Sequence, residues 1–138
     1  MSLSDDIKST LEADDDLMDL LTGGVHNDVE EINRQDTPTA FNSSTKELKP
    51  CALIKIGTES KRGPYERSVQ TPVTIYFYQR SGYNIIEQAM EMTYDLLNDQ
   101  RIGTGVWQLI YELSVNQQRD IPLDCPLGSH RFVAVRHR

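Results

Sequence analysis

The spacing of apolar residues changes twice between Val69 and Arg136, and this change restricts the folds that the chain can adopt. Alternating apolar and polar residues place side chains on the two faces of a strand, whereas spacings of three and four place them on one side of a helix. The stretch predicts a helix packed on one face of a sheet, with strands over 69–79, 106–116 and 131–136 and the helix over 84–98.

Two further elements are predicted before this stretch. Apolar residues at helical spacing predict a helix over about 4–22, with the Ser4 hydroxyl suited to its N-cap and Gly23–Gly24 to its end. Alternating apolar residues predict a strand over 51–56. Residues 25–50 have weak periodicity and many polar side chains, so we expect a long connection there.

A charged hairpin arm is predicted between the first two strands, from Gly57 to Ser68. Its glycine, proline and charged residues are typical of an exposed turn. The alternatives for it are a solvated tip without a partner, a nucleic-acid contact and a protein contact. Its excess length and alternating charges favour a protein contact, because phosphate binding would favour uniform basic charge. The expected protein-contact residues are Glu59, Lys61, Arg62, Tyr65, Glu66 and Arg67.

Single residues refine the predicted sheet and helix. Pro72 cannot donate a ladder hydrogen bond, so it predicts a sheet edge or a bulge. Asn84 is expected to cap the helix, and Trp107 or Leu109 is expected to face its apolar side. Two prolines predict an irregular polar excursion over 116–130.

These elements and the composition predict one α+β domain over residues 1–138. Its core over 51–136 is expected to be a mainly antiparallel four-stranded sheet, with helices packed on one face and the long hairpin arm extending from it. No apolar run approaches the roughly 18 residues of a membrane span, and the first residues do not resemble a secretory signal. We therefore expect the protein to stay in the cytoplasm of the cell that makes it and to have no membrane partner. Cys51 and Cys125 lack CxxC spacing, so neither a zinc site nor a redox pair is expected.

Negative charge is concentrated at the front of the chain. Residues 1–36 carry eleven carboxylates against Lys8 and Arg34, a net charge of −9, so the rest of a chain of net charge −7 carries +2. A protein that grips duplex DNA is expected to carry a basic stripe. The charge distribution therefore disfavours a DNA-gripping function.

No sequence motif predicts catalysis, a metal or a cofactor. Ser129, His130 and Asp124 suggest a nucleophile, a base and an orienting group, but adjacent residues rarely point at each other and no oxyanion motif accompanies them. The three consecutive carboxylates of Asp14–Asp16 point in different directions, which favours a solvated helix face or a turn over a cation site. We expect a protein that is not an enzyme and that has no cofactor.

Four segments resemble the tail terminator family of long-tailed bacteriophages, also called tail completion or minor tail proteins. The segments are LMDLLTGGV (Leu17–Val25), PCALIKIG (Pro50–Gly57), VTIYFYQRSGYNIIEQAMEMTYDLL (Val73–Leu97) and RFVAVR (Arg131–Arg136). The order of the predicted elements is also similar. Together the segments span most of the chain, and they resemble the family in pattern rather than in a catalytic signature.

The resemblance implies an α+β subunit that assembles in the host cytoplasm into a homohexameric ring of the virion neck. Such a ring caps the tail tube, stops its polymerisation and docks it to the head connector. Genomic DNA would pass through the lumen without sequence-specific binding, and an acidic lumen would repel it. The alternatives are a head-completion or connector protein of the same neck, a small cytoplasmic ferredoxin-like enzyme and a monomeric binding domain.

Overall fold

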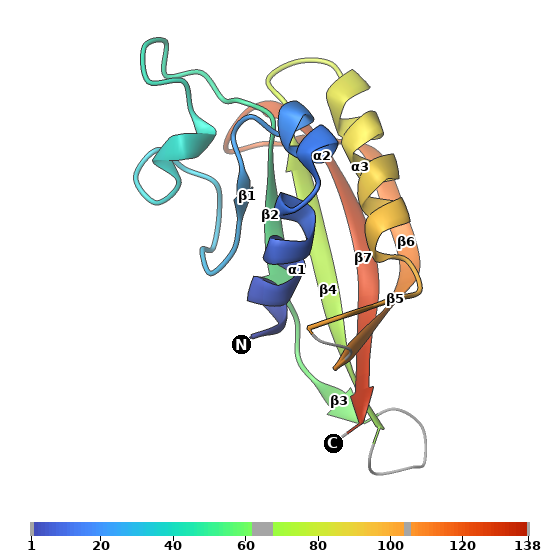
Figure 1. Cartoon of the computed structure of the whole chain (residues 1–138). Helices are drawn as coiled ribbons and strands as arrows, with labels where there is room; N and C mark the ends of the chain where they lie inside the picture. Colours follow the sequence, from blue (N-terminus) through green and yellow to red (C-terminus); the bar gives the residue numbers. More distant parts are fainter. Residues whose placement is uncertain (1, 62–67, 104–105, 138) are drawn as a thin grey trace.

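The computed structural model describes residues 2–61, 68–103 and 106–137, and within them it contains three α-helices beside one long sheet (Figure 1). The helices are α1 (Leu3–Glu12), α2 (Asp15–Leu20), α3 (Asn84–Leu97) and the 3₁₀-helix η1 (Pro38–Ala40). The strands are β1 (Val25–His26), β2 (Cys51–Ile56), β3 (Ser60–Lys61), β4 (Ser68–Tyr78), β5 (Gln100–Ile102), β6 (Trp107–Asp120) and β7 (Cys125–His137).

The seven described strands form one sheet in the order β1-β2-β4-β7-β6-β5, and β3 also pairs with β4. Only β1 and β2 are parallel, and the other pairs are antiparallel. The predicted α+β class and mainly antiparallel sheet are confirmed, whereas the prediction of four strands is wrong. The additional strands β1, β3 and β5 contain two or three residues each, which is too few to produce a periodic signal.

The predicted excursion over 116–130 is also wrong. Strands β6 and β7 continue pairing as far as Asp120 and Cys125, so that a short turn joins two long strands. In a strand, the nitrogen and the carbonyl of one residue point to the same side. The Pro126 carbonyl faces Gln79, which lies just beyond the end of β4, so the ring nitrogen also points there and the proline is tolerated inside β7. No ladder hydrogen bond from a proline N–H is needed there.

Pro72 occupies an interior strand rather than the predicted edge. Strand β4 pairs with β7 on one side and with β2 and then β3 on the other. The Gly57 N–H donates to the Pro72 carbonyl at 2.8 Å, so the carbonyl and the ring nitrogen of Pro72 both face the second side. On that side Pro72 lies beside the gap between the end of β2 and the start of β3. The interruption between the two short strands removes the need for a donor at this position.

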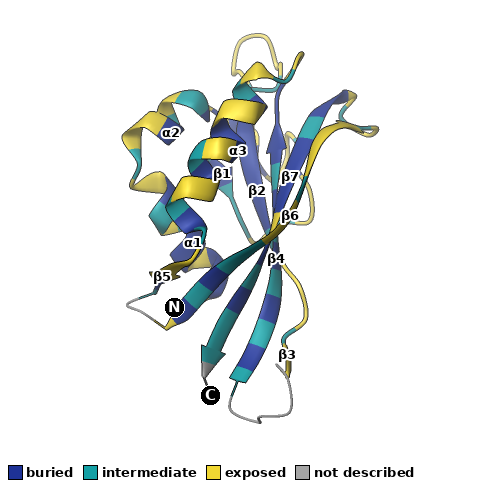
Figure 2. Cartoon of the chain, turned by 90° about the vertical axis from the view of Figure 1, so that its right-hand side faces the viewer, coloured by how far each residue is buried: buried dark blue, intermediate teal, exposed yellow. Residues whose placement is uncertain are grey.

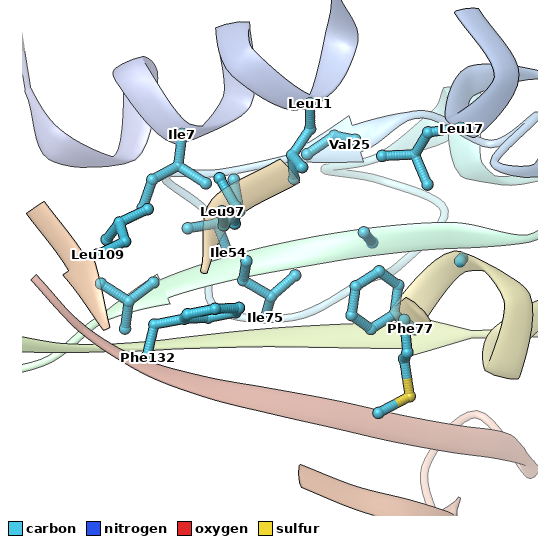
Figure 3. Close-up of a cluster of buried hydrophobic side chains, with 14 of the residues drawn as sticks. Ile7, Leu11, Leu17, Val25, Ile54, Ile75, Phe77, Leu97, Leu109 and Phe132 are labelled. Carbon is cyan, nitrogen blue, oxygen red and sulfur yellow. The ribbon is translucent and has the colours of Figure 1, made fainter. Parts of the chain in front are cut away.

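The main core lies between the three α-helices and the sheet (Figure 3). Residues at every second position of β4 are buried, which gives the strand its striped pattern in Figure 2, and Val73, Ile75 and Phe77 among them belong to this core. Leu109 is fully buried and Trp107 is 8 % exposed in the same cluster as Ile86, Met90 and Leu97. This confirms the prediction that these strand residues pack on the helical side.

Helix caps explain where the N-terminal helices begin. The predicted helix over 4–22 is interrupted, because Asp14 leaves helical geometry and its carboxylate accepts from the Leu17 N–H at 2.9 Å to start α2. Ser2, rather than Ser4, caps α1 by accepting from the Asp5 N–H at 3.2 Å. Ser4 lies within the helix and is buried.

Gln79 caps α3 instead of the predicted Asn84. Its side-chain oxygen accepts from the Ile85 and Ile86 N–H groups at 3.0 and 3.1 Å, and its amide donates to the Asn84 side chain at 2.7 Å. A cap supplied from six residues upstream is outside the local pattern that predicts helix starts.

The long connection between β1 and β2 covers part of the second face of the sheet. Ile32 and Ala40 of this connection are buried against Leu53, Tyr78 and Cys125 in a second apolar cluster. The segment predicted as a loop therefore contains β1 and η1 and buries one half of the face opposite the helices.

Candidate interaction surface

The base of the hairpin arm is fixed to the sheet. Strand β3 pairs with β4, and Arg136 of β7 donates to the Glu59 carboxylate at 3.1 Å. The Arg136 guanidinium also lies over the Trp107 ring, 4.7 Å from its centroid. Lys61 is exposed at the end of β3. The other four predicted contact residues lie outside the described residues, namely Arg62, Tyr65, Glu66 and Arg67.

A bulge in β6 turns the second half of this strand over. Tyr111 pairs with Phe132, but Leu113 pairs with Arg131, so Glu112 is an extra residue in the ladder. An extra residue shifts the alternation of side chains by one. Regular alternation would place Leu113 and Val115 on the core face with Leu109, but the bulge moves them to the other face, where they are 42 % and 37 % exposed.

The bulge adds Leu113 and Val115 to an apolar surface on the half of the sheet that the long connection leaves uncovered. Strand register places its members side by side on the face opposite the helices, and none of them is fully buried. We call this surface the open face, and it consists of Pro72 and Thr74 of β4, Ile110, Leu113 and Val115 of β6, and Val133 and Val135 of β7, with the charged Arg131 of β7 between Thr74 and Leu113. Exposed apolar side chains gathered on one face of a sheet, with a charged residue among them, are typical of protein contact surfaces.

At both edges of the sheet, backbone N–H and C=O groups are left without a neighbouring strand among those described. Among the described strands, none pairs with the outer edge of β6 beyond Leu109 or with that of β2 beyond Leu53. The Asn98 side chain accepts from the Tyr111 N–H at 3.2 Å, so the uncovered part of β6 begins at the bulge. Such edges are suited to pairing with another chain.

A polar network lies behind the open face, on the helical side of β6. The His130 ring donates through Nε2 to the Met90 carbonyl at 2.5 Å, since a carbonyl only accepts. The other ring nitrogen then accepts from the Ser114 hydroxyl at 2.6 Å, and Ser114 accepts from the Tyr111 hydroxyl at 2.5 Å. The four groups satisfy one another and join β6, β7 and α3.

Burial lowers the pKa of His130 below its ordinary value of 6.5, and the hydrogen bond to Met90 opposes this only in part. The unfolded chain therefore binds more protons than the folded protein as the pH falls through 6.5. We expect the free energy of unfolding to decrease on acidification from about 6.5 towards the lowered pKa. Urea denaturation at several pH values measures this, and a His130→Gln variant should lose less stability over the same range. An equal loss in both proteins would contradict the assignment to His130.

The residues considered for catalysis or metal binding are not assembled. His130 bonds Ser114 rather than Ser129, while Asp124 forms an ion pair with Arg119. Within the described residues, no group of three or more histidine, cysteine, aspartate or glutamate side chains is arranged to hold a metal ion. In the same part of the chain, no helix is long and apolar enough to cross a membrane.

Both cysteine thiols are buried. Burial raises the pKa of Cys51 to about 12 and that of Cys125 to about 11. They are therefore protonated at neutral pH and act as small apolar residues of the second cluster.

Comparison with known proteins gives a likeness in structure. No family model matches the chain, and no curated protein matches it in sequence. A chain in the solved structure described as "Virion of native gene transfer agent (GTA) particle" aligns with a TM-score of 0.65 at 14 % identity, covering 99 % of this chain and 96 % of that chain. The protein is similar in fold to a virion chain. At this identity the likeness establishes the fold, and it extends over nearly the whole length of both chains.

Proposed function

We propose that this protein is a structural subunit of a phage-like virion, and that it forms a homohexameric ring at the head–tail joint. The observation that carries the proposal is the end-to-end fold likeness to a virion chain, since neither chain has a large part that the other lacks. The resemblance of the four sequence segments to tail terminators supports the position at the joint. In this role the ring caps the tail tube, stops its polymerisation and docks it to the head connector.

The surfaces of the subunit suit a protein that neighbouring copies complete. The open face presents apolar side chains that no described segment covers, and the two sheet edges present backbone donors and acceptors. Contacts at such surfaces bury apolar area and pair the free edges. The hairpin arm, with its base fixed by Glu59 and Arg136, is the proposed contact with a neighbouring protein of the joint. The acidic front of the chain would repel the DNA that passes through the lumen.

The purified protein should form rings that contain six copies, either alone or when mixed with the tail tube protein. Native mass spectrometry measures the number of copies, and negative-stain electron microscopy shows the shape. Replacing Leu113 and Val115 with aspartate should leave the far-ultraviolet circular dichroism unchanged and reduce ring formation roughly tenfold or more, because charges would be buried on the open face.

A matched control is Val106→Asp, which changes an aliphatic residue that is 50 % exposed just before β6, outside the open face. This variant should still form rings. A parent protein that stays monomeric at every concentration, with and without tube protein, would refute the ring. Rings that bind the head connector but never stop tube growth would instead favour a head-completion protein of the same neck.

A further inference from the structure

A hollow of about 590 Å³ lies where the long connection between β1 and β2 meets the β6–β7 turn. Phe41, Leu48 and Leu123 provide its apolar part and belong to the border of the second cluster. An antiparallel bridge joins Phe41 to Leu48, and the Asn42 side chain accepts from the Ser44 and Thr45 N–H groups within the turn that they enclose. We call this cavity the loop hollow, and its walls are built by hydrogen bonds.

The loop hollow is basic in an acidic protein. Its cations are Arg34, Lys46 and Arg80, against the carboxylates of Glu47 and Asp124. Asp124 is paired with Arg119, which does not line the hollow, and Glu47 is paired with Arg80 at 3.0 Å. No carboxylate among the described residues pairs with Arg34 or Lys46. The hollow therefore has an excess of positive charge, although the whole chain carries −7.

The geometry of Arg34 keeps this charge at the rim. Its guanidinium donates to the Lys46 carbonyl at 3.0 Å and lies 5.6 Å from the centroid of the Phe41 ring. The side chain is thus fixed by a neutral acceptor and an aromatic face, and both leave its charge uncompensated. An occupant that combines carboxylates with apolar side chains would match the rim and the apolar part together.

The α2 segment of the same chain has this combination. Asp14 and the helix carry four carboxylates and no basic side chain, and Asp15, Asp16 and Asp19 are exposed. Met18 and Leu20 beside them are half-buried, and Met18 packs against the main core whereas Leu20 does not. Helix α2 packs on the main core through Leu17, whereas the loop hollow borders the second cluster on the opposite face of the sheet. The two surfaces therefore point in different directions on one subunit.

We infer that α2 of one copy docks in the loop hollow of the next copy. Carboxylates of Asp15, Asp16 and Asp19 meet the cations of the hollow, and Leu20 approaches Phe41 and Leu123. Because the contact joins two different patches, it is head-to-tail and closes a ring when the rotation between copies divides a full turn. The inference rests on the proposed ring and assigns one of its contacts. The charges would set the register of the copies and make assembly sensitive to salt.

A charge exchange tests the contact. The hollow variant carries Lys46→Asp and Arg80→Glu, with aspartate at position 46 because that residue has a φ of 62°. The helix variant carries Asp16→Lys and Asp19→Lys. Each variant alone should raise the concentration needed for ring formation roughly tenfold or more, because like charges then face each other. Sedimentation velocity at low salt measures this, and circular dichroism confirms that the monomers are folded.

Restoration is the decisive measurement. One chain with all four substitutions should form rings again, and so should an equimolar mixture of the two variants, since each then offers the other a complementary partner. A control with Lys8→Glu and Arg101→Glu makes the same change in net charge as the hollow variant, at cations that do not line the loop hollow, and should assemble like the parent.

The outcomes separate the two proposals. A parent that forms no assembly overturns both the ring and this contact. A parent that forms rings, with a hollow variant that also does, overturns only the contact. If the single variants fail to assemble and neither the fourfold variant nor the mixture recovers, the hollow receives a different acidic partner and the inference is wrong.

Discussion

Replacing Leu97 with alanine should lower the free energy of unfolding by about 2–5 kcal/mol. Leu97 is fully buried near the end of α3, and Figure 3 shows its side chain in the same cluster as Leu109 and residues of α1. Truncation removes apolar contacts and leaves a cavity between elements that the sheet holds in place. Urea denaturation of the monomer, monitored by circular dichroism, measures the change.

Leu96→Ala provides the control for this substitution. Leu96 is the preceding residue of the same helix and is only half-buried, so helix propensity changes equally while less buried area is lost. It should cost clearly less than Leu97→Ala. A larger loss at Leu96 would mean that the helix presents a different side to the sheet.

Replacing Gly128 with alanine should destabilise the protein by about 1–3 kcal/mol, although it adds only one methyl group. A Cβ atom at this position of β7 would lie 2.7 Å from both Ile86 Cγ2 and Met90 Sδ, and 3.1 Å from the Asn116 carbonyl oxygen. The methionine can move aside, but the branched isoleucine on α3 and the β6 backbone cannot do so without shifting the helix or the strand.

A double-mutant cycle separates this overlap from a general effect of losing glycine. Ile86→Ala removes the Cγ2 atom and opens space beside Gly128. In that background the additional cost of Gly128→Ala should be smaller than in the parent, because the two sites share one contact. Strictly additive costs would show that the close approach of α3 to β7 does not restrict this position.

The sequence alone determined the central elements of the fold. Periodicity predicted β2 over 51–56 as observed, and β4 and α3 to within one residue at each end. These elements could be predicted because each buries one face, and burial on one face produces a period of two or 3.6 residues. The concentration of acidic residues at the front of the chain was also evident from the residues themselves.

Tertiary structure decided everything that depends on residues distant in the sequence. Strands β1, β3 and β5 exist because a longer neighbour offers them hydrogen bonds, and Pro72 and Pro126 are tolerated because neighbouring strands are interrupted beside them. The network around His130 unites two strands and the Met90 carbonyl of α3. A polar serine and histidine within apolar strands were the available signal, but their partners could not be deduced from it.

One of the candidate surfaces was predicted from the sequence, and the other two depend on the tertiary structure. Alternating charge identified the hairpin arm from the sequence, although only its base lies in the described residues. Leu113 and Val115 belong to the open face because of one extra residue, Glu112, since regular alternation would place them on the same face as Leu109. The loop hollow likewise depends on two turns separated by about half of the chain, which meet only because β4 and β7 lie side by side. Local patterns record which face of an element is buried, and they do not record where the ladder shifts or which distant turns meet.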